Sequence, residues 1–186
     1  MKALIDADIL CYEIPFIAQR KGEDDELILL SEHIVLKILE EKIYNIAEKA
    51  QCDDFTLYLS SSDIPNFRYD VATIKPYKGN RKNLEKPYYY NFVRQYMLDE
   101  FNPVIAEYIE ADDMLRIDQL ASGNECVVCG IDKDLNQIVG LHYDWRKDYH
   151  YEIDEDGANC WFWCQTLIGD VADNIPGITR FGPKRS

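Results

Sequence analysis

The sequence contains no long run of apolar residues. No stretch approaches the roughly 20 residues that a membrane-spanning helix needs, and the amino terminus, MKALIDAD, lacks the apolar segment of a signal peptide. We therefore expect a chain that remains in the cytoplasm and has no membrane partner. The sequence also shows no internal repeat and no low-complexity tract, and 186 residues suffice for one domain with a sizeable core.

Histidine and positive charge are both scarce. The three histidines lie in no motif, and the six cysteines of a cytosolic chain are more consistent with reduced core residues than with disulfides. Lys and Arg number 20 against 34 Asp and Glu, which gives a net charge of −14. Because phosphate binding usually requires a basic surface, this balance at first argues against a nucleic-acid partner. Whether the argument holds depends on where the acids lie.

Apolar segments that suit strands alternate with segments of helical periodicity. We predict strands at residues 2–5, 55–59, 103–108, 126–131, 138–143 and 149–153, and helices at about 31–50, 110–120 and 158–168. The first of these helices has Val35, Leu39, Ile43 and Ile46 on one face. Strands that alternate with helices predict an α/β domain, with a mainly parallel twisted sheet and helices on both faces.

Carboxylates follow the ends of several predicted elements. The groups are Asp6 and Asp8; Glu110, Asp112 and Asp113; Asp132 and Asp134; and Asp170 and Asp173. The carboxyl ends of parallel strands meet at one edge of a sheet, where ligands bind in open α/β folds. Members of a pair also share a face of their strand or helix, so their oxygens can point into one space. Taken singly, each group is equally explained as a helix start or a solvated turn.

Such a gathering of carboxylates requires cations. Within several ångströms of one another the acids would repel, and they would not all ionise without positive charge between them. No His or Cys accompanies them, and oxygen ligands alone select a hard ion such as Mg²⁺ or Mn²⁺. With this many acids, we expect two ions rather than one.

One segment reverses the charge balance of the chain. Between Arg68 and Lys86, six basic residues stand against two acidic ones, so the segment carries a net charge of +4. It also contains Tyr69 and Tyr77, and three further tyrosines follow at 88–90. Cations interleaved with aromatic rings suit a single strand or a frayed end, because phosphates pair with the cations while bases stack on the rings. A solvated basic loop is the alternative, but an accompanying hard-metal site favours phosphodiester chemistry.

Five motifs occur in order along the chain: ALIDADIL, PYKGNRK, EADDML, GIDKDLNQIV and LIGDVADNIPGITRFGPKR. Together they resemble the 5′-nuclease family, which comprises flap endonucleases, phage 5′→3′ exonucleases, phage replication ribonuclease H and the 5′-nuclease domains of bacterial DNA polymerases. The form resembles the phage members most. The motifs extend from Ala3 to Arg185, and although each alone is weak, all five in order are highly specific.

The resemblance implies a PIN-like α/β fold with two divalent ions, Mg²⁺ or Mn²⁺. Carried over by motif, the ligands of the first ion would be Asp6, Glu110, Asp112 and Asp113, and those of the second Asp132, Asp134, Asp170 and Asp173. The family also has an acid after the second strand, for which Asp63 is the candidate, whereas Asp8 is expected to support the ligands. Neutralising these nine ligands would bring the net charge from −14 to −5, so the acidity is largely that of the site.

The same resemblance assigns the basic segment, at about residues 68–90, to an arch over the active site. Lys78 and Arg81 would contact the scissile phosphate as catalytic residues, and Tyr77 would stack on a base. The predicted nucleic-acid-binding residues are Arg68, Lys75, Tyr77, Lys78, Arg81, Lys82 and Lys184. The implied mechanism is in-line attack by a metal-activated water, while the metals and Lys78 stabilise the charge that develops on phosphate.

The closing run GDxxDNIPGxxxxGPK resembles the start of the family's helix-three-turn-helix, which grips duplex DNA and often holds K⁺. Pro183 suits the first position of a helix, but the residues that remain to Ser186 are too few to form one. We therefore expect a catalytic domain at residues 1–168 and an incomplete helix-three-turn-helix at 169–186, which would bind K⁺ only if completed.

These expectations describe a monomeric, Mg²⁺-dependent 5′-nuclease of replication or repair that acts as an exonuclease, a flap endonuclease or both. Its partner would be DNA with a 5′ end, flap or nick, or an RNA/DNA hybrid, in the host cytoplasm if the gene is a phage gene. Two alternatives stay open: a nuclease-like protein that binds nucleic acid without cutting it, and a phosphatase of the haloacid dehalogenase type. The phosphatase would use LIDADIL as its nucleophile motif but would leave EADD and PYKGNRK unexplained.

Overall fold

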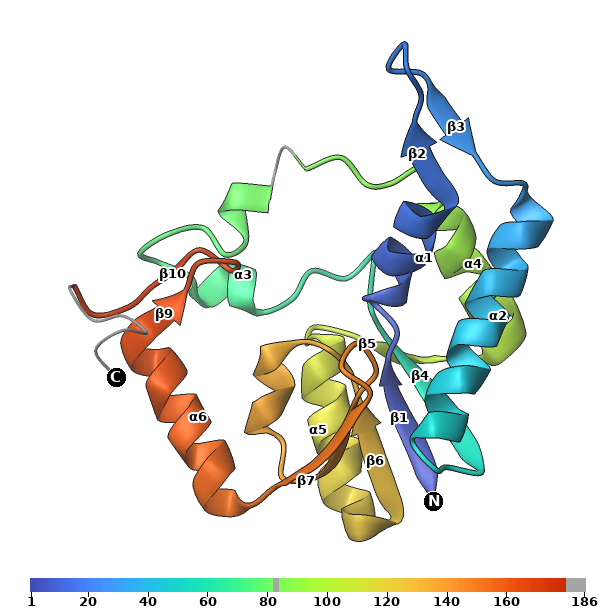
Figure 1. Cartoon of the computed structure of the whole chain (residues 1–186). Helices are drawn as coiled ribbons and strands as arrows, with labels where there is room; N and C mark the ends of the chain where they lie inside the picture. The colour runs from blue at the N-terminus through green and yellow to red at the C-terminus, as the bar shows by residue number, and fades with distance from the viewer. Residues whose placement is uncertain (82–83, 180–186) are drawn as a thin grey trace.

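A six-stranded sheet forms the centre of the computed structural model, which describes residues 1–81 and 84–179. In spatial order its strands are β5 (Val104–Ala106), β4 (Asp54–Ser60), β1 (Lys2–Asp6), β6 (Cys126–Cys129), β7 (Gly140–Asp144) and β8 (Tyr149–Ile153). Neighbouring strands are parallel except β7 and β8, which pair antiparallel. The prediction of a mainly parallel sheet is confirmed (Figure 1).

Helices cover both faces of this sheet, as the sequence predicts (Figure 1). One face carries α1 (Leu10–Ala18), α2 (Glu32–Lys49) and α4 (Tyr90–Phe101); the other carries α5 (Ala111–Ser122), with the 3-10 helix η3 (Lys133–Gln137) and α6 (Glu155–Ile168) beside it. None of the helices in the described ranges combines the length and the apolar character that crossing a membrane requires.

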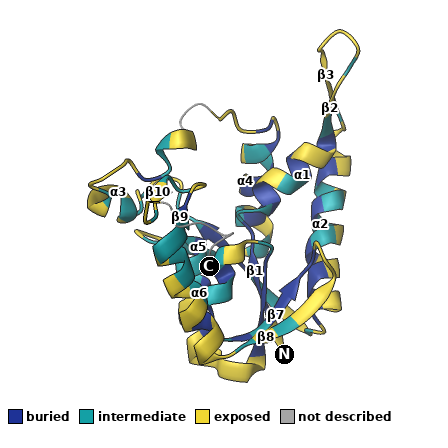
Figure 2. Ribbon diagram, turned by 60° about the vertical axis from the view of Figure 1, so that its left-hand side comes forward, coloured by how far each residue is buried: buried dark blue, intermediate teal, exposed yellow. Residues whose placement is uncertain are grey.

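Alternate side chains of β1 enter two different cores. Ala3 and Ile5 pack on the side of α2, whereas Leu4 packs with Leu115 of α5. Because both faces of the sheet are covered, the central strands are the most buried part of the molecule (Figure 2) and are composed almost wholly of apolar residues.

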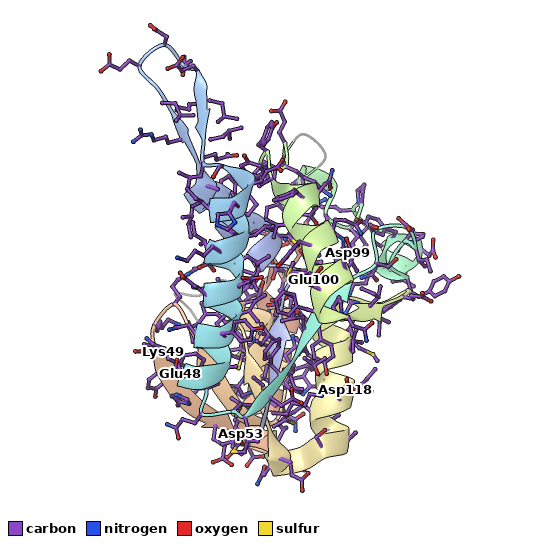
Figure 3. All side chains as sticks on the ribbon, turned by 90° about the vertical axis from the view of Figure 1, so that its right-hand side faces the viewer. Glu48, Lys49, Asp53, Asp99, Glu100 and Asp118 are labelled. Atoms are coloured by element: carbon purple, nitrogen blue, oxygen red, sulfur yellow. The ribbon has the colours of Figure 1, made fainter. Side chains whose placement is uncertain are left out.

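The few polar groups in these cores have hydrogen-bond partners. On the α5 face, the phenol of the buried Tyr58 donates a hydrogen bond to Asp118 (labelled in Figure 3) at 2.6 Å, which satisfies the polar end of the ring. Cys126 and Cys129 face the two different cores, as expected of a strand, while Cys160 of α6 is exposed rather than part of a core.

Helices α1 and α4, the short helix α3 (Arg68–Val71) and a hairpin lie where the sequence patterns predict no element. Helix α1 contains a buried proline, Pro15, and α4 buries Arg94 among apolar residues, so neither has a clean amphipathic pattern. The hairpin of β2 (Gln19–Lys21) and β3 (Leu27–Leu29) projects from the body with an exposed acidic tip (Figures 1 and 2). Tertiary contacts therefore stabilise α1 and α4 where local pattern is weak.

The chain folds back sharply after α6. Strand β9 (Gly169–Asp170) pairs antiparallel with β10 (Ile175–Pro176), and Gly169 has a φ of +79°, which side chains rarely adopt. A Cβ on Gly177 would lie 2.0 Å from the carbonyl oxygen of Ile168, so glycine is required there too. This tight turn fixes the position of Asp170. Pro183, which suits the first position of a helix, lies outside the described residues.

Candidate active site

The carboxyl ends of β1, β4 and β6 face a cavity of about 650 Å³. Seven of the nine predicted metal ligands line it, together with Asp8: Asp6, Glu110, Asp112, Asp132, Asp134, Asp170 and Asp173. Its basic lining residues are Lys78, Arg81, Lys86, Arg94 and Lys133. One cavity thus brings together acids and cations that are far apart in sequence, while their binding roles stay predictions.

Asp6 ends β1 at the floor of this cavity and is 3% exposed. Two residues later, Asp8 accepts hydrogen bonds from the backbone N–H of Ser60, at 3.1 and 3.2 Å, and from Arg94 at 3.5 Å. Burial, followed by the charges of Asp112 and Asp8, raises the pKa of Asp6 well above its ordinary value. Burial also raises the pKa of Asp8, although Ser60 and Arg94 oppose the shift. Ionising both acids therefore costs folding free energy.

The start of α5 places Glu110 and Asp112 in the same cavity. The backbone N–H of Ala111 donates to the hydroxyl of Ser60 across 3.0 Å, which ties this end of the helix to the end of β4. Burial, followed by the charge of Asp132, raises the pKa of Asp112 well above its ordinary value. Asp6 and Asp112 are thus two acids with raised pKa values, and the charge of Asp112 contributes to the shift of Asp6.

Asp113 does not line this cavity, and its role as a metal ligand stays a prediction. Its two carboxylate oxygens accept hydrogen bonds from Arg68 at 2.6 and 2.8 Å, and one of them also accepts from the backbone N–H of Glu110 at 3.0 Å. Burial by itself would raise the pKa of Asp113, but the bonds from Arg68 outweigh it and the pKa is lowered. Arg68, which is predicted to contact nucleic acid, is engaged by Asp113 in this structure.

We predict that Arg68 and Asp113 are energetically coupled. In a cycle of Arg68→Met, Asp113→Asn and the double variant, we expect a coupling free energy of about 1–2 kcal/mol, because the pair is bidentate and half-buried. Urea unfolding of the four chains in EDTA measures it. Additive losses from the two single changes would contradict the pairing.

Asp132 and Asp134 begin the 3-10 helix η3. An oxygen of Asp132 accepts a hydrogen bond from the backbone N–H of Asp134 at 2.9 Å, which caps this short helix. Asp134 itself accepts a hydrogen bond from the amide of Gln165 on α6. Burial, followed by the charge of Asp132, raises the pKa of Asp134. Two further carboxylates therefore enter the cavity from a fixed backbone.

The turn after α6 supplies Asp170 and Asp173. Asp170 accepts hydrogen bonds from Lys133 at 2.8 Å and from the backbone N–H of Ala172 at 2.7 Å. Burial would raise the pKa of Asp170, but the bond from Lys133 outweighs it and the pKa is lowered. Asp173 pairs with Arg81 at 2.9 Å. In contrast to Asp6 and Asp112, both acids of this turn have a cationic partner.

The basic segment folds down onto this turn. Hydrogen bonds of 2.8 to 3.0 Å join residues 76–81 to residues 171–174, through Lys78 N–H to Asp173 O, Asn80 to Val171 O, Arg81 Nε to Ala172 O, and Asn174 to Pro76 O. Lys78 has a φ of +50°, a conformation in which strain is tolerated only when the surroundings enforce it. Its ammonium group forms an ion pair with Glu110. Lys78 and Arg81 are therefore held against the carboxylates of the cavity.

Tyr77 is buried within the same network. Its phenol oxygen lies 2.8 Å from Glu110 and 2.9 Å from Asp173. A phenol has one proton, so it donates to only one of the two carboxylates at a time. Burial, followed by the charge of Glu110, raises the pKa of Tyr77. Stacking of Tyr77 on a base stays a prediction, and the structure adds a hydrogen-bonding role.

Two other predicted residues of the described ranges, Asp63 and Lys75, do not line the cavity. Asp63 is exposed and accepts a hydrogen bond from the hydroxyl of its neighbour Ser62 at 2.8 Å. Its prediction as a metal ligand is thus not matched by its position, because the chain leaves the sheet edge after Ser60. Lys75 is exposed outside the cavity, while Lys82 and Lys184 lie outside the described residues.

Three cations of the cavity have no role in the sequence analysis. Arg94 is 8% exposed and donates to the carbonyl of Ser60 at 2.5 Å. A charged residue on the apolar face of α4 is the signal that would have found it. Lys86 lies over the ring of Tyr90 at 3.9 Å, and Lys133 stands between two acids of a motif already noted. Only the tertiary structure shows that these three cations lie near the carboxylates of the cavity.

In the described part of the chain, no group of three or more His, Cys, Asp or Glu side chains is arranged so as to hold a metal ion. Cations occupy the spaces between the acids instead: Lys78 beside Glu110, Arg81 beside Asp173 and Lys133 beside Asp170. The observed arrangement is thus one in which protein cations offset part of the negative charge.

Two phage nucleases are similar to this chain in sequence. The exonuclease of Escherichia phage T7 is 28% identical over 157 residues, which cover 78% of this chain and 51% of the relative. The exodeoxyribonuclease of Enterobacteria phage T3 is 27% identical over the same shares. These matches support the resemblance to the 5′-nuclease family that the motifs indicate. No family model matches it, and it spans about half the length of these curated relatives.

Solved structures of 5′-nucleases have the same fold. The flap endonuclease of bacteriophage T5, in a pseudo-enzyme-product complex with DNA and metal ions, matches 99% of this chain and 72% of its own with a TM-score of 0.71 and 16% identity. A T5 5′-exonuclease with bound zinc matches with a TM-score of 0.72 and 16% identity, over 100% of this chain and 73% of its own. The catalytic core of Rad2 in complex with DNA substrate matches with a TM-score of 0.55 and 14% identity, over 98% of this chain and 58% of its own. The likeness confirms the predicted fold class.

The donor set of this cavity is chemically suited to divalent cations. Oδ1 of Asp6 is buried and has no hydrogen-bond partner among the described residues, which is costly for a carboxylate oxygen. The half-buried Asp112 is likewise repelled by neighbouring acids. Both need positive charge within the cavity, and carboxylate oxygens favour a hard ion. The matches to phage nucleases, in turn, give the haloacid dehalogenase alternative no support.

Proposed function

We propose that this chain is a divalent-metal-dependent 5′-nuclease that hydrolyses phosphodiester bonds near the 5′ end of DNA or of an RNA/DNA hybrid. One observation carries the proposal: Asp6, Asp112 and Asp132, from different parts of the chain, line a cavity that Lys78 and Arg81 also line. Phosphodiester hydrolysis needs this combination, because hard ions must bind beside the phosphate while cations neutralise its charge. The match to phage exonucleases supports the same chemistry.

We propose two Mg²⁺ or Mn²⁺ ions as cofactors, held by two groups of carboxylates. Asp6, Glu110 and Asp112 would hold one ion, and Asp132, Asp134, Asp170 and Asp173 the other. When bound, such ions lower the pKa of a water molecule and stabilise negative charge on the reacting oxygens. Asp113 is left out of the first group because Arg68 engages both of its oxygens.

The chain's own cations position the phosphate. Lys78 and Arg81 now neutralise Glu110 and Asp173, with 23% and 45% of their side chains exposed. A phosphate that enters the cavity offers them a new anionic partner, and ions that bind the carboxylates release them. Both groups then stabilise the charge that develops on phosphate, as preorganised donors.

The substrate is proposed to be DNA with a 5′ end, flap or nick, bound by a monomer in the cytoplasm. Residues 169–186 would begin the helix-three-turn-helix that grips the duplex, with Lys184 among its contacts and K⁺ bound if the motif is completed. The described start of this segment already packs against residues 76–81. The basic segment and the duplex grip would therefore move as one unit when nucleic acid binds.

The test is cleavage of a 5′-labelled flap and a nicked duplex by the chain with Mg²⁺, with EDTA and Asp132→Asn as controls. We expect product only with Mg²⁺, and a loss of at least roughly 100-fold in rate for Asp132→Asn, because an ion ligand is removed. Undiminished product from the variant would overturn the catalytic assignment. Nucleic-acid binding without any Mg²⁺-dependent product would establish the non-catalytic alternative.

A further inference from the structure

We infer that Gln165 of α6 is a positioning residue that fixes Asp134 for the second divalent ion. The inference rests on the proposed function for the ion, but on contacts of this chain for the role of Gln165. The amide of Gln165 donates a hydrogen bond to Oδ1 of Asp134 and accepts one from the amide of Gln137 at 2.5 Å. Gln137, Gln165 and Asp134 thus form a hydrogen-bonded relay: Gln137 orients the amide of Gln165, and Gln165 orients the carboxylate of Asp134.

Gln165 reaches Asp134 from a second cavity, of about 430 Å³, that neither Lys78 nor Arg81 lines. This cavity adjoins the first and shares Asp134 and four other predicted ligands with it, whereas Gln137 and Gln165 line only the second. A phosphate bound beside Lys78 would therefore lie in the first cavity, and we expect Gln165 to act on the reaction through Asp134.

Gln165 differs chemically from the partners of the other predicted ligands. Glu110, Asp170 and Asp173 are hydrogen-bonded to Lys or Arg, which must yield before a cation can take their place. Gln165 is neutral, so it fixes the carboxylate of Asp134 without neutralising it. The nearest ammonium group, that of Lys133, is 4.0 Å from Asp134 and lies closer to Asp170. Asp134 is thereby oriented yet keeps its charge for an ion.

The relay also couples two ligands through one helix. Gln165 lies in the last turn of α6, and Asp170 follows the end of the same helix after Gly169. Gln137 ends η3, whose start carries Asp132 and Asp134. The bonds between Gln137, Gln165 and Asp134 therefore join η3 to α6 and hold the carboxylates of the second ion at a fixed separation. Partners of this kind typically change metal affinity 10- to 100-fold when removed.

The experiment compares Gln165→Met with Gln95→Met in the full chain. Gln95 is a matched control, because its amide also donates to a carboxylate, that of Asp99 (labelled in Figure 3), at 2.8 Å, but both residues are exposed and neither lines the cavity. Mn²⁺ is titrated into each protein without nucleic acid, and free Mn²⁺ is measured by electron paramagnetic resonance. We expect the weaker of the two bound ions to bind roughly 10-fold less tightly in Gln165→Met and unchanged in Gln95→Met. Gln137→Met should give a smaller loss of the same sign.

Cleavage assays separate this inference from the proposed function. We expect Gln165→Met to raise the Mg²⁺ concentration for half-maximal cleavage roughly 10-fold, with a smaller change in the rate at saturating Mg²⁺ and none in DNA affinity in EDTA. If the parent chain cleaves nothing, the proposed function fails, while the Mn²⁺ titration still decides the role of Gln165. Equal Mn²⁺ affinity in Gln165→Met and parent, with both folded by circular dichroism, would overturn the inference. Should Gln165→Met not fold, Gln165→Asn, which shortens the amide by one methylene, takes its place under the same criteria.

Discussion

Replacing Asp112 by Asn is expected to raise the stability of the metal-free chain while it abolishes Mg²⁺-dependent cleavage. Asp112 is half-buried, and burial, followed by the charges of Asp132 and Glu110, raises its pKa. At neutral pH its ionised form therefore opposes folding, and a neutral amide of the same size removes that repulsion. We expect a gain of about 1–3 kcal/mol in EDTA and a loss of roughly 10³-fold or more in cleavage rate, since the charge that binds the ion is gone.

The gain should depend on pH in a defined direction. The pKa of Asp112 in the folded chain lies above its ordinary value of 3.8, so the folded state binds its proton more readily than the unfolded state. Its favourable contribution is fully present below the unfolded pKa and is lost as pH rises through the folded pKa. The stability difference between Asp112→Asn and the parent should therefore be largest at neutral pH and shrink towards pH 4.

Thermal unfolding in EDTA across this pH range measures the difference, with Asp118→Asn as the matched control. Asp118 lies on the same helix, but it faces Tyr58 and not the cavity (Figure 3). We expect Asp118→Asn to keep full cleavage and to show no gain in stability. A melting temperature for Asp112→Asn below that of the parent in EDTA would contradict the prediction that ionised Asp112 destabilises the metal-free chain. Mg²⁺ should stabilise the parent far more than Asp112→Asn.

Replacing Lys78 by Met is expected to lower the cleavage rate at saturating nucleic acid by about 10²–10³-fold, the range seen when one preorganised donor to a developing anion is removed. Lys78 lines the cavity, and its conformation is fixed by its backbone bond to Asp173. Its ammonium group also neutralises Glu110. We therefore expect Lys78→Met to be less stable than the parent in EDTA, and Mg²⁺ to restore part of the loss.

Lys75→Met is the control for Lys78→Met. Lys75 belongs to the same basic segment but is exposed and outside the cavity. Its removal should weaken nucleic-acid binding and reduce its salt dependence, with little effect on the rate at saturation. Single-turnover cleavage at several substrate concentrations separates the two effects. Equal changes in affinity alone for both variants would show that Lys78 only binds nucleic acid.

The sequence predicts much of the fold because the strands are short apolar runs and two of the helices have regular apolar faces. Val35, Leu39 and Ile43 of α2 are all buried as their spacing indicates. The hairpin of β2 and β3 and the helix α4 escape this reasoning, since their apolar residues gain their meaning only from α1 and α2 beside them. Arg94 illustrates the limit: a buried arginine is intelligible only once Asp8 and the carbonyl of Ser60 are seen next to it.

The sequence by itself determined which acids meet. Asp6, Asp112 and Asp132 follow elements of a parallel sheet, and parallel strands necessarily end at one edge. Only the tertiary structure decided which of them are free to hold an ion, because that depends on the partners that other elements bring. Asp113 is taken by Arg68, Asp63 lies beyond the cavity, and Asp134 is held by the neutral Gln165. Spacing along a chain fixes the direction of a side chain, whereas its electrostatic partner is set by contacts between distant segments.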